Sequence, residues 1–210
     1  MKKLILILIY TVFWRNFNKI IIGLRYHNHK SLGNKKQFIL IANHNSHMDT
    51  MAIMSAMPSR YIHRVHPIAA SDFFGGSKWN KFLMRYLVNA TLIPRKKADS
   101  DVEVDPIEIM SDLLKKGRSI ILYPEGSRGI PGVMSDFKKG IGYLIQKNPE
   151  VDVIPVYLEG LHKTLPKGRS IILPYNCNII FGKSIQYDSL EIEDIVGKSE
   201  EAIHNLINSE

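Results

Sequence analysis

A histidine and an aspartate near the start of the chain have the types and spacing of a general-base pair. The stretch ANHNSHMDT (residues 42–50) follows the apolar run 38–41 and contains His44 and Asp49. An imidazole can accept a proton near neutral pH, and a carboxylate on one ring nitrogen leaves the other free to do so. Residues five positions apart lie about 140° apart around an ideal helix. The two side chains can therefore meet only if His44 precedes the helix and folds back over its first turn.

Other interpretations of this stretch are open. Asp49 can serve only as a helix-capping residue, and His47 can be a simple surface residue. A metal site of His44, His47 and Asp49, as in a metal-dependent hydrolase, is a further alternative. No glutamate stands beside the first histidine to support it, and no further ligand is evident.

Two more stretches place an arginine just after an expected strand. YPEGSRG (residues 123–129) carries Glu125 and Arg128, and LIPRKK (residues 92–97) carries Arg95. A guanidinium group presents a planar fork of donors that matches phosphate oxygens. Both arginines are therefore candidates for binding a phosphorylated substrate.

Hydrophobic periodicity and capping signals divide the chain into alternating elements. Strands are expected at 20–26, 37–42, 66–70, 91–93, 119–123, 153–158, 170–173 and 178–181. Helices are expected at 48–57 with Ser46 as the cap, at 75–87, at 106–116 with Asp105 as the cap, at 138–147, and from about 199. Pro155 inside a strand indicates an edge, a bulge or a bend.

This alternation predicts an α/β fold. We expect a single layered domain with a central, mostly parallel or mixed sheet flanked by helices, at residues 31–210. Residues 1–30 are expected to form a separate membrane-associating segment. The irregular spacing of the strands leaves their order open.

The N-terminal segment is almost wholly apolar from Leu4 to Phe13, and no small-residue cleavage site follows. As a helix this run is only about 15 Å long, roughly half of the ~30 Å hydrocarbon core of a bilayer. We expect an interfacial helix, whose anchors at headgroup level are Trp14, Tyr10, Lys2, Lys3 and Arg15. The alternative is a helix that packs on the protein's own core.

Charge and composition narrow the class of partner. The 210-residue chain has a net charge of +8, while residues 188–210 carry −6, so residues 1–187 carry +14. Such a surplus indicates an anionic membrane face or a phosphorylated substrate, with simple solubility as the alternative. No recognition-helix or RNA-binding signature appears, so nucleic acid is not an expected partner. The single cysteine, Cys177, excludes a disulfide within the chain.

Four ordered blocks within residues 38–160 resemble those of the glycerophospholipid acyltransferases, the family of lysophosphatidic acid (1-acylglycerol-3-phosphate) acyltransferase. NHNSHMD is similar to the family's N-H-x-S-x-x-D block, TLIPR to its second, YPEGSRG to F-P-E-G-T-R-S, and VIPV to its fourth. FKKG (residues 137–140) matches the F-K-x-G that follows the third block. Ser127 and Gly129 replace a usual threonine and serine, and Pro94 precedes Arg95 where many members differ.

The resemblance implies direct acyl transfer from a thioester to a hydroxyl group. His44 would take the proton from the acceptor hydroxyl, and Asp49 would hold the imidazole tautomer and stabilise the cation. No cofactor and no metal are implied. The substrate-binding residues that the resemblance implies are Arg95, Glu125, Gly126, Ser127 and Arg128.

The expected activity is that of a 1-acylglycerol-3-phosphate acyltransferase, which converts lysophosphatidic acid to phosphatidic acid in phospholipid biosynthesis. Acyl-coenzyme A or acyl-acyl carrier protein would be the donor. The alternatives are the same chemistry on glycerol-3-phosphate or another lysolipid, and a non-catalytic lipid-binding protein of the same fold. The expected location is monotopic, on the cytoplasmic face of a membrane.

Overall fold

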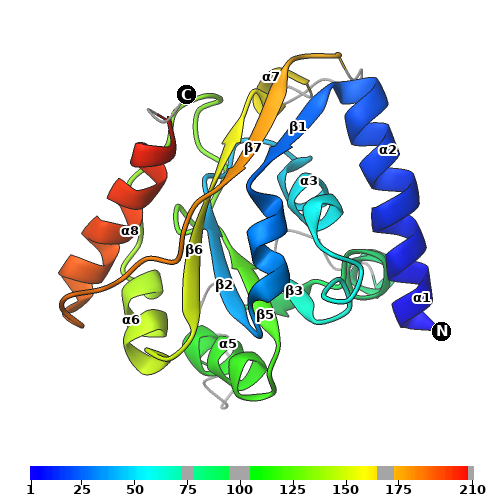
Figure 1. Ribbon diagram of the computed structural model, residues 1–210. Helices are drawn as coiled ribbons and strands as arrows, with labels where there is room; N and C mark the ends of the chain where they lie inside the picture. The colour runs from blue at the N-terminus through cyan, green and yellow to red at the C-terminus, as the bar shows by residue number, and fades with distance from the viewer. Residues whose placement is uncertain (72–77, 95–104, 165–172, 208–210) are drawn as a thin grey trace.

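A mixed seven-stranded sheet forms the centre of the protein (Figure 1). The computed structural model describes residues 1–71, 78–94, 105–164 and 173–207. Within them the strand order is β1-β7-β6-β2-β5-β3-β4, and every neighbouring pair is parallel except β6 and β7. The strands are β1 (Leu24–His27), β2 (Phe38–Ala42), β3 (Val65–Ala70), β4 (Thr91–Ile93), β5 (Ser119–Leu122), β6 (Asp152–Glu159) and β7 (Cys177–Phe181). The expected α/β class is confirmed.

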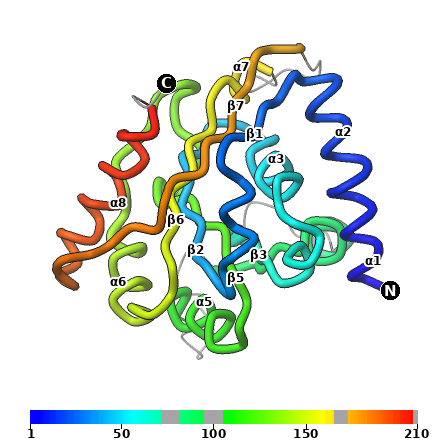
Figure 2. Tube along the Cα trace, viewed as in Figure 1, coloured from blue at the N-terminus to red at the C-terminus, as the bar shows by residue number. Residues whose placement is uncertain are grey.

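Helices cover both faces of this sheet (Figures 1 and 2). One face carries α3 (Asp49–Ala56) and a continuous N-terminal helix, and the other carries α5 (Pro106–Lys115), α6 (Gly140–Lys147) and α8 (Ile192–Ile207). The N-terminal helix consists of α1 (Lys2–Ile7), η1 (Leu8–Trp14), α2 (Arg15–Phe17) and η2 (Asn18–Ile22). The remaining helical elements are η3 (His29–Asn34), α4 (Lys78–Leu83), η4 (Met84–Val88) and α7 (Leu161–Thr164).

Strand β2 is buried on both sides, as its apolar sequence predicts. Phe38, Leu40 and Ala42 pack in the core beneath α3, whereas Ile39 and Ile41 pack in the core beneath α6 and α8. The alternation follows from the two-residue period of a strand. Because β6, β2 and β5 are parallel neighbours, the loops after them leave the sheet at the same edge. This edge is where open α/β sheets place their ligands.

Pro155 lies in an interior strand, which excludes the first of the three alternatives, an edge strand. β6 pairs with β2 on one side and with β7 on the other. The pairing with β7 begins only at Val156, and the Pro155 carbonyl accepts a hydrogen bond from the Gly182 N–H at 2.8 Å. The N and C=O of one strand residue point to the same side, so the missing N–H of Pro155 faces a position where β7 has already ended. The sheet therefore loses no ladder hydrogen bond there.

The N-terminal helix is longer than expected and belongs partly to the core. Residues 20–22, expected in a strand, end the helix before Gly23, whose φ of +76° terminates it. Its 21 residues are long and apolar enough to cross a membrane by length and composition. Nevertheless Leu6, Tyr10, Asn18 and Ile22 are fully buried in the protein, so Tyr10 is a core residue and the expectation that it anchors the helix at headgroup level was wrong. One face of this helix therefore packs on the core, which was the alternative interpretation, while its other face is exposed.

Arg15 explains how a polar residue fits inside this long helix. Its guanidinium donates to the carbonyl oxygens of Ser55 and Met57, both at 2.8 Å. These carbonyls lie at the end of α3, where the last helical C=O groups lack partners within the helix and the dipole favours a cation. Arg15 therefore joins the N-terminal helix to the end of the helix that carries Asp49, instead of standing at headgroup level as expected.

Replacing Arg15 by alanine is expected to lower the free energy of unfolding by about 2 kcal/mol, because two charge-assisted hydrogen bonds are lost and carbonyl groups are left unpaired. Lys19→Ala removes an exposed cation from the same helix and should change stability by less than ~0.5 kcal/mol. Urea denaturation of both variants and the wild-type protein measures the difference. Equal stabilities for the two variants would show that the Arg15 contacts do not join the helices.

Other expectations were met in part. The helix expected at 75–87 appears as α4 and η4, and its first residues lie outside the described part of the chain, as does most of the strand expected at 170–173. α8 begins at Ile192 rather than near Ser199. In the local sequence, Gly197 and Ser199 indicate a helix boundary. In the fold, Ile195 is buried and the Ser199 hydroxyl bonds the Tyr187 hydroxyl at 2.8 Å, so tertiary contacts extend the helix backwards.

Candidate active site

His44 and Asp49 meet at the carboxyl end of β2. The Nδ1 atom of His44 lies 2.9 Å from Oδ2 of Asp49. His44 stands in the loop before α3 and folds back over the first turn of the helix, which is the only arrangement that the five-residue spacing permits. An ionised carboxylate only accepts hydrogen bonds, so Nδ1 carries the proton and Nε2 has the free lone pair. The His44 side chain is 20% exposed, which leaves Nε2 open to an incoming group.

Asp49 is the buried anchor of this loop. Its side chain is 1% exposed, and Oδ2 also accepts hydrogen bonds from the backbone N–H groups of Asn45 at 2.8 Å and Ser46 at 2.9 Å. Asp49 is also the first residue of α3, where the helix dipole favours a negative charge. These contacts hold both the carboxylate and the loop that carries His44.

Ser46 does not cap α3 as expected. The N-cap position is Met48, and the Ser46 hydroxyl instead accepts a hydrogen bond from the Met48 N–H at 3.2 Å. A capping box would pair Ser46 and Asp49 in both directions, and only one of the two bonds is present, from the Ser46 N–H to the Asp49 carboxylate. The reason is that the loop turns tightly enough to bring His44 onto Asp49, and this moves the helix start to Asp49 itself.

Asn43 fixes the beginning of the same loop. Its side-chain amide donates to the Leu158 carbonyl at 3.0 Å, and its amide oxygen accepts from the Leu158 N–H at 2.7 Å. These two bonds copy a backbone pairing and continue the contact between β2 and β6 beyond the end of β2. The asparagine before His44 therefore determines the direction in which the loop leaves the sheet.

Glu125 joins three segments behind His44. The Glu125 carboxylate is buried, with the residue 3% exposed, and it accepts hydrogen bonds from the N–H groups of His44 at 2.6 Å and Ser135 at 2.9 Å. Burial raises the pKa of Glu125, and these two N–H groups oppose the shift by stabilising the charged form. Glu125 thus holds the His44 backbone in place, a positioning role rather than direct contact with a reacting group.

Tyr123 supports the imidazole from one side. Its ring stacks on the His44 ring, with the centroids 4.0 Å apart and the planes 18° apart. The Tyr123 hydroxyl bonds the Thr50 hydroxyl at 2.9 Å, and burial raises the pKa of Tyr123 well above its ordinary value. The stacked ring restricts rotation of the imidazole, so together with Asp49 it presents Nε2 in one direction.

Arg128 lies within electrostatic reach of the pair. Burial lowers the pKa of the half-buried Arg128, and the Asp49 charge opposes this shift. Burial lowers the pKa of His47, and the positive charge of Arg128 lowers it further. Burial also lowers the pKa of His162, on α7, against the Asp49 charge. Arg128 therefore lies within range of the Asp49 and His47 charges.

A lysine side chain packs against the turn after β5. Gly126 has a φ of +75°, and a Cβ atom there would lie 2.8 Å from the Nζ atom of Lys138. The Lys138 N–H also donates to the Pro124 carbonyl at 3.0 Å. Only glycine fits this turn without strain. Ser127, the next residue, is exposed at the surface of the turn.

Arg95 lies outside the described residues. β4 ends at Ile93, and Pro94 leaves the sheet at the same edge as the loops after β2 and β5. Among the residues that the structure describes, no group of three His, Cys, Asp or Glu side chains is arranged to hold a metal ion.

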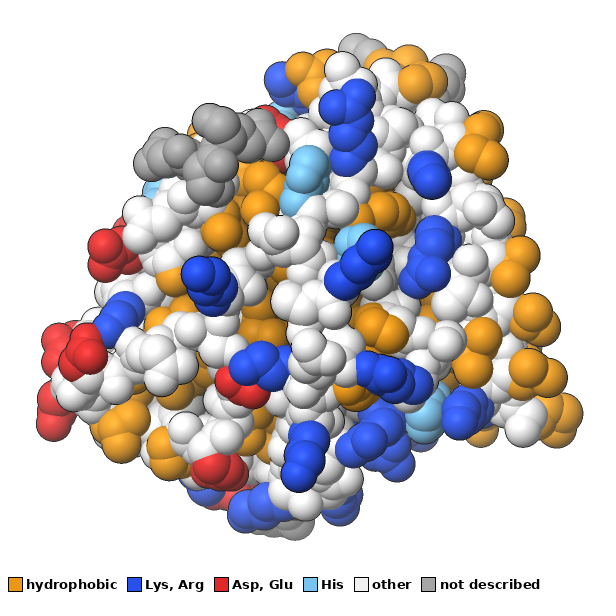
Figure 3. Space-filling view, viewed as in Figure 1, with side chains coloured by type: hydrophobic (Ala, Val, Ile, Leu, Met, Phe, Trp, Pro, Cys, Tyr) orange, Lys and Arg blue, Asp and Glu red, His pale blue; other side chains and the backbone are white. Residues whose placement is uncertain are grey.

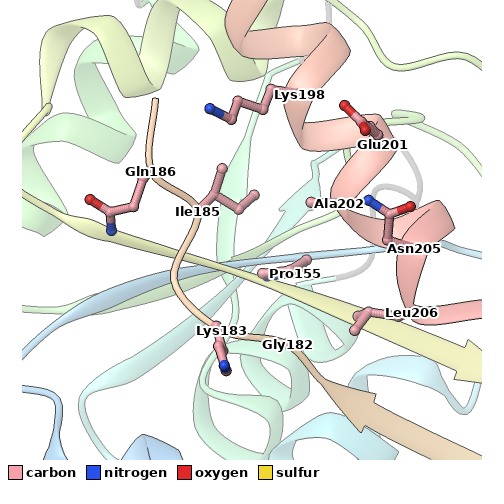
Figure 4. A pocket seen from close by; sticks show the side chains of 10 residues that line it. All are labelled: Pro155, Gly182, Lys183, Ile185, Gln186, Lys198, Glu201, Ala202, Asn205 and Leu206. Atoms are coloured by element: carbon pink, nitrogen blue, oxygen red, sulfur yellow. The ribbon is translucent and has the colours of Figure 1, made fainter. Parts of the chain in front are cut away.

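Sequence reasoning missed several residues of this site. Asn43 belongs to the block NHNSHMD and Tyr123 to the block YPEGSRG, so both could have been found from the sequence. Ser135 and His162 carry no local signal, because only the fold brings them near Glu125 and Asp49. A separate hollow lies between the segment after β7 and α8 (Figure 4), and no predicted site residue lines it.

A mixed, mostly parallel α/β sheet carries a buried carboxylate paired with an imidazole at the carboxyl end of a central strand, an arrangement that can support general-base chemistry. Comparison with known proteins specifies the family. The family model described as acyltransferase matches residues 23–159, and the chain belongs to this family.

Known relatives share a common name. The chain is 28% identical over 155 residues to the chloroplastic 1-acyl-sn-glycerol-3-phosphate acyltransferase LPAT1 of Arabidopsis thaliana. This alignment covers 73% of this chain and 41% of that protein. It is 23% identical over 171 residues to the mouse 1-acyl-sn-glycerol-3-phosphate acyltransferase alpha, covering 81% of this chain and 57% of that protein. The chain thus spans about half the length of these curated relatives.

A solved structure has the same fold. The crystal structure of the 1-acyl-sn-glycerophosphate acyltransferase PlsC from Thermotoga maritima superimposes with a TM-score of 0.71 at 23% sequence identity. The match covers 93% of this chain and 77% of that one.

Proposed function

We propose that this protein transfers a fatty acyl group from a thioester to the free hydroxyl of lysophosphatidic acid and so forms phosphatidic acid. The observation that carries the proposal is the His44–Asp49 hydrogen bond of 2.9 Å beside Arg128. A base that can accept a proton and a cation that can bind a phosphate are the two groups that such an acceptor requires. The names of the relatives support the same acceptor.

The reaction needs no covalent intermediate on the enzyme. As the acceptor hydroxyl oxygen attacks the thioester carbonyl carbon, His44 Nε2 takes its proton and a new C–O bond forms. The C–S bond then breaks, and the imidazolium returns the proton to the leaving thiolate. Asp49 stabilises the imidazolium through Nδ1–H throughout.

Arg128 binds the acceptor phosphate in this proposal. The guanidinium contributes a fork of charged donors, and its half-buried position strengthens the attraction to an anion. Arg95, from the second block, is proposed as a further phosphate ligand on the strength of the family resemblance. Glu125, Gly126 and Ser127 shape the turn around the glycerol part of the acceptor.

The exposed face of the N-terminal helix supports attachment of this chemistry to a membrane. Its exposed face is apolar, with Leu4, Leu8 and Phe13 each more than half exposed. A helix that buries one face in the protein and leaves the other apolar suits an interfacial position, where both acceptor and product reside. The acyl donor, acyl-coenzyme A or acyl-acyl carrier protein, and a cytoplasmic orientation are part of the proposal.

An acyl-transfer assay tests the function. The purified full-length protein is mixed with each donor and a panel of acceptors: lysophosphatidic acid, lysophosphatidylethanolamine and glycerol-3-phosphate. We expect a new ester mainly on lysophosphatidic acid, detected by mass spectrometry. Preference for another acceptor would show that this acceptor, and not lysophosphatidic acid, is the substrate. Binding of lysolipid without any ester from either donor would indicate a non-catalytic lipid-binding protein.

Arg128→Ala is expected to raise the KM for lysophosphatidic acid by about 10- to 100-fold with little change in kcat, because a charged hydrogen bond to the phosphate is lost in ground and transition states alike. Steady-state kinetics with each substrate varied in turn measures it. Arg128→Lys should recover only part of the loss, since it keeps the charge without the fork. Arg25→Ala, on the edge strand β1, is the matched control. A change confined to the donor KM would assign Arg128 to the other substrate.

A further inference from the structure

An exposed row of aromatic side chains runs along α4 and η4. Trp79, Phe82 and Tyr86 are 65%, 46% and 45% exposed. Their spacing of three and four residues puts them on one face of the helix. The rings of Trp79 and Phe82 have centroids 5.6 Å apart, and those of Phe82 and Tyr86 are 4.4 Å apart. We call these three residues the aromatic row. A soluble surface seldom leaves three neighbouring aromatic rings uncovered.

The aromatic row adjoins the N-terminal helix. α1 lies against η4, and the Lys2 ammonium stands 5.5 Å from the centroid of the Tyr86 ring. On α1, Leu4, Ile5 and Leu8 are exposed. In Figure 1 α4 and η4 lie beside α1 near the N-terminus, and in Figure 3 hydrophobic side chains follow the same margin of the molecule. Two helices therefore contribute to one continuous apolar surface.

A group of cations borders this apolar surface at the N-terminal end of α1. Arg85 and Arg118 both act electrostatically on Lys2. The Arg64 guanidinium donates to the Gly117 carbonyl at 2.8 Å, next to Arg118, and Lys2 lies over the ring of Tyr86, next to Arg85. The charges of Arg118 and Lys2 also add to burial in lowering the pKa of His66. Lys3 and Arg64 act in the same way on His63. We call the five cationic residues of this group the basic cluster: Lys2, Lys3, Arg64, Arg85 and Arg118.

Apolar aromatic residues beside a basic cluster are complementary to one partner, the surface of a bilayer that contains anionic lipid. Aromatic rings are favoured at the level of the lipid headgroups, and each Lys or Arg nearby attracts anionic headgroups. A protein partner or a second copy of the chain would need a surface both apolar and acidic. The continuity with the N-terminal helix favours the bilayer, because that helix exposes the same kind of surface.

We propose that α4 and η4 form a second membrane-binding element, which inserts the aromatic row into the bilayer while the basic cluster binds anionic headgroups. It goes beyond the proposed function, in which only the N-terminal helix contacts the membrane. Two contacts on separate helices fix the rotation of the protein about the N-terminal helix. They thereby determine how the site at the carboxyl end of β2 faces the lipid.

Vesicle co-sedimentation of the full-length protein tests this element. Binding is measured to vesicles of phosphatidylcholine alone and to vesicles that also contain phosphatidylglycerol. Trp79→Ser with Phe82→Ser should weaken binding to both kinds of vesicle by at least about tenfold, because buried aromatic area is lost. Lys3→Gln with Arg85→Gln should weaken binding only to anionic vesicles, by about fivefold for each charge removed.

Matched controls lie on the opposite face of the sheet. Tyr143→Ser with Leu190→Ser removes two exposed apolar side chains, and Lys147→Gln with Lys183→Gln removes two exposed cations near α6 and α8. Neither control should change binding to either vesicle. If the aromatic-row variant binds as its control does, or if it differs only in self-association without vesicles, the second membrane-binding element does not exist.

The same variants separate this inference from the proposed function. Acyl transfer to lysophosphatidic acid in detergent micelles does not need attachment to a bilayer, so the aromatic-row and basic-cluster variants should keep wild-type rates there. Unchanged vesicle binding together with normal micellar activity would overturn the second element and leave the enzyme intact. If the wild-type protein has no activity in micelles, the proposed function is overturned, and the vesicle-binding result still decides whether the second membrane-binding element exists.

Discussion

Replacing His44 by alanine is expected to lower kcat/KM for acyl transfer by about 10³-fold, within the range of 10²–10⁴ that general-base catalysis contributes. Without the imidazole, the acceptor hydroxyl must lose its proton to water as it attacks the thioester. The side chain is partly exposed and its one described hydrogen bond goes to Asp49, so the fold should persist. Initial rates of ester formation measure the effect, and circular dichroism checks the fold.

His47→Ala is the matched control for this variant. His47 is an exposed imidazole three residues away in the same loop region, so its removal should change the rate by less than about tenfold. Equal losses in the two variants would favour a site that uses both histidines, such as the metal-binding alternative, and a chelator that abolishes wild-type activity would support that reading. Full activity of His44→Ala would falsify the base assignment.

Asp49→Asn is expected to lower kcat by about 10²–10³-fold while largely preserving the structure of the loop. The amide oxygen can still accept the hydrogen bonds that Oδ2 accepts from Asn45 and Ser46. The neutral amide cannot stabilise an imidazolium ion, and it does not enforce the tautomer that leaves Nε2 free. The loss should therefore appear in kcat rather than in the KM of either substrate.

Asp105→Asn provides the same chemical change at a site with no role in the reaction. Asp105 is exposed and caps α5 through a hydrogen bond from the Ile107 N–H at 2.8 Å, which asparagine can replace. Melting temperatures of both variants should stay near that of the wild type, and only Asp49→Asn should lose activity. If Asp49→Asn melts much earlier yet turns over normally while folded, Asp49 is a structural cap and nothing more.

Local signals in the sequence were sufficient wherever a feature depends on neighbouring residues. β2 follows from its apolar run, β4 coincides with residues 91–93, and α5 has the predicted cap at Asp105 and proline at its first position. The His44–Asp49 contact could also be predicted, because the spacing leaves only one geometry in which the two can meet. Periodicity and capping act within a few residues, so one sequence is enough to reveal them.

Features that depend on distant partners could not be predicted. The N-terminal helix continues through Arg15 and Asn18 because both side chains find acceptors some forty positions away. Arg15 donates to the carbonyl oxygens of Ser55 and Met57, and Asn18 donates to the Ser55 hydroxyl. Glu125 was singled out from its block, but its hydrogen bonds from the N–H groups of His44 and Ser135 could not be predicted, because His44 lies 81 positions and Ser135 ten positions away.

A crystal structure of the wild-type protein with lysophosphatidic acid, without acyl donor, tests the central claim most directly. We expect the free hydroxyl oxygen to lie about 3 Å from Nε2 of His44, with Nδ1 still hydrogen-bonded to Asp49 and the phosphate in contact with Arg128. A lipid bound with its hydroxyl far from this nitrogen, or an imidazole turned away from Asp49 when the lipid is present, would contradict it.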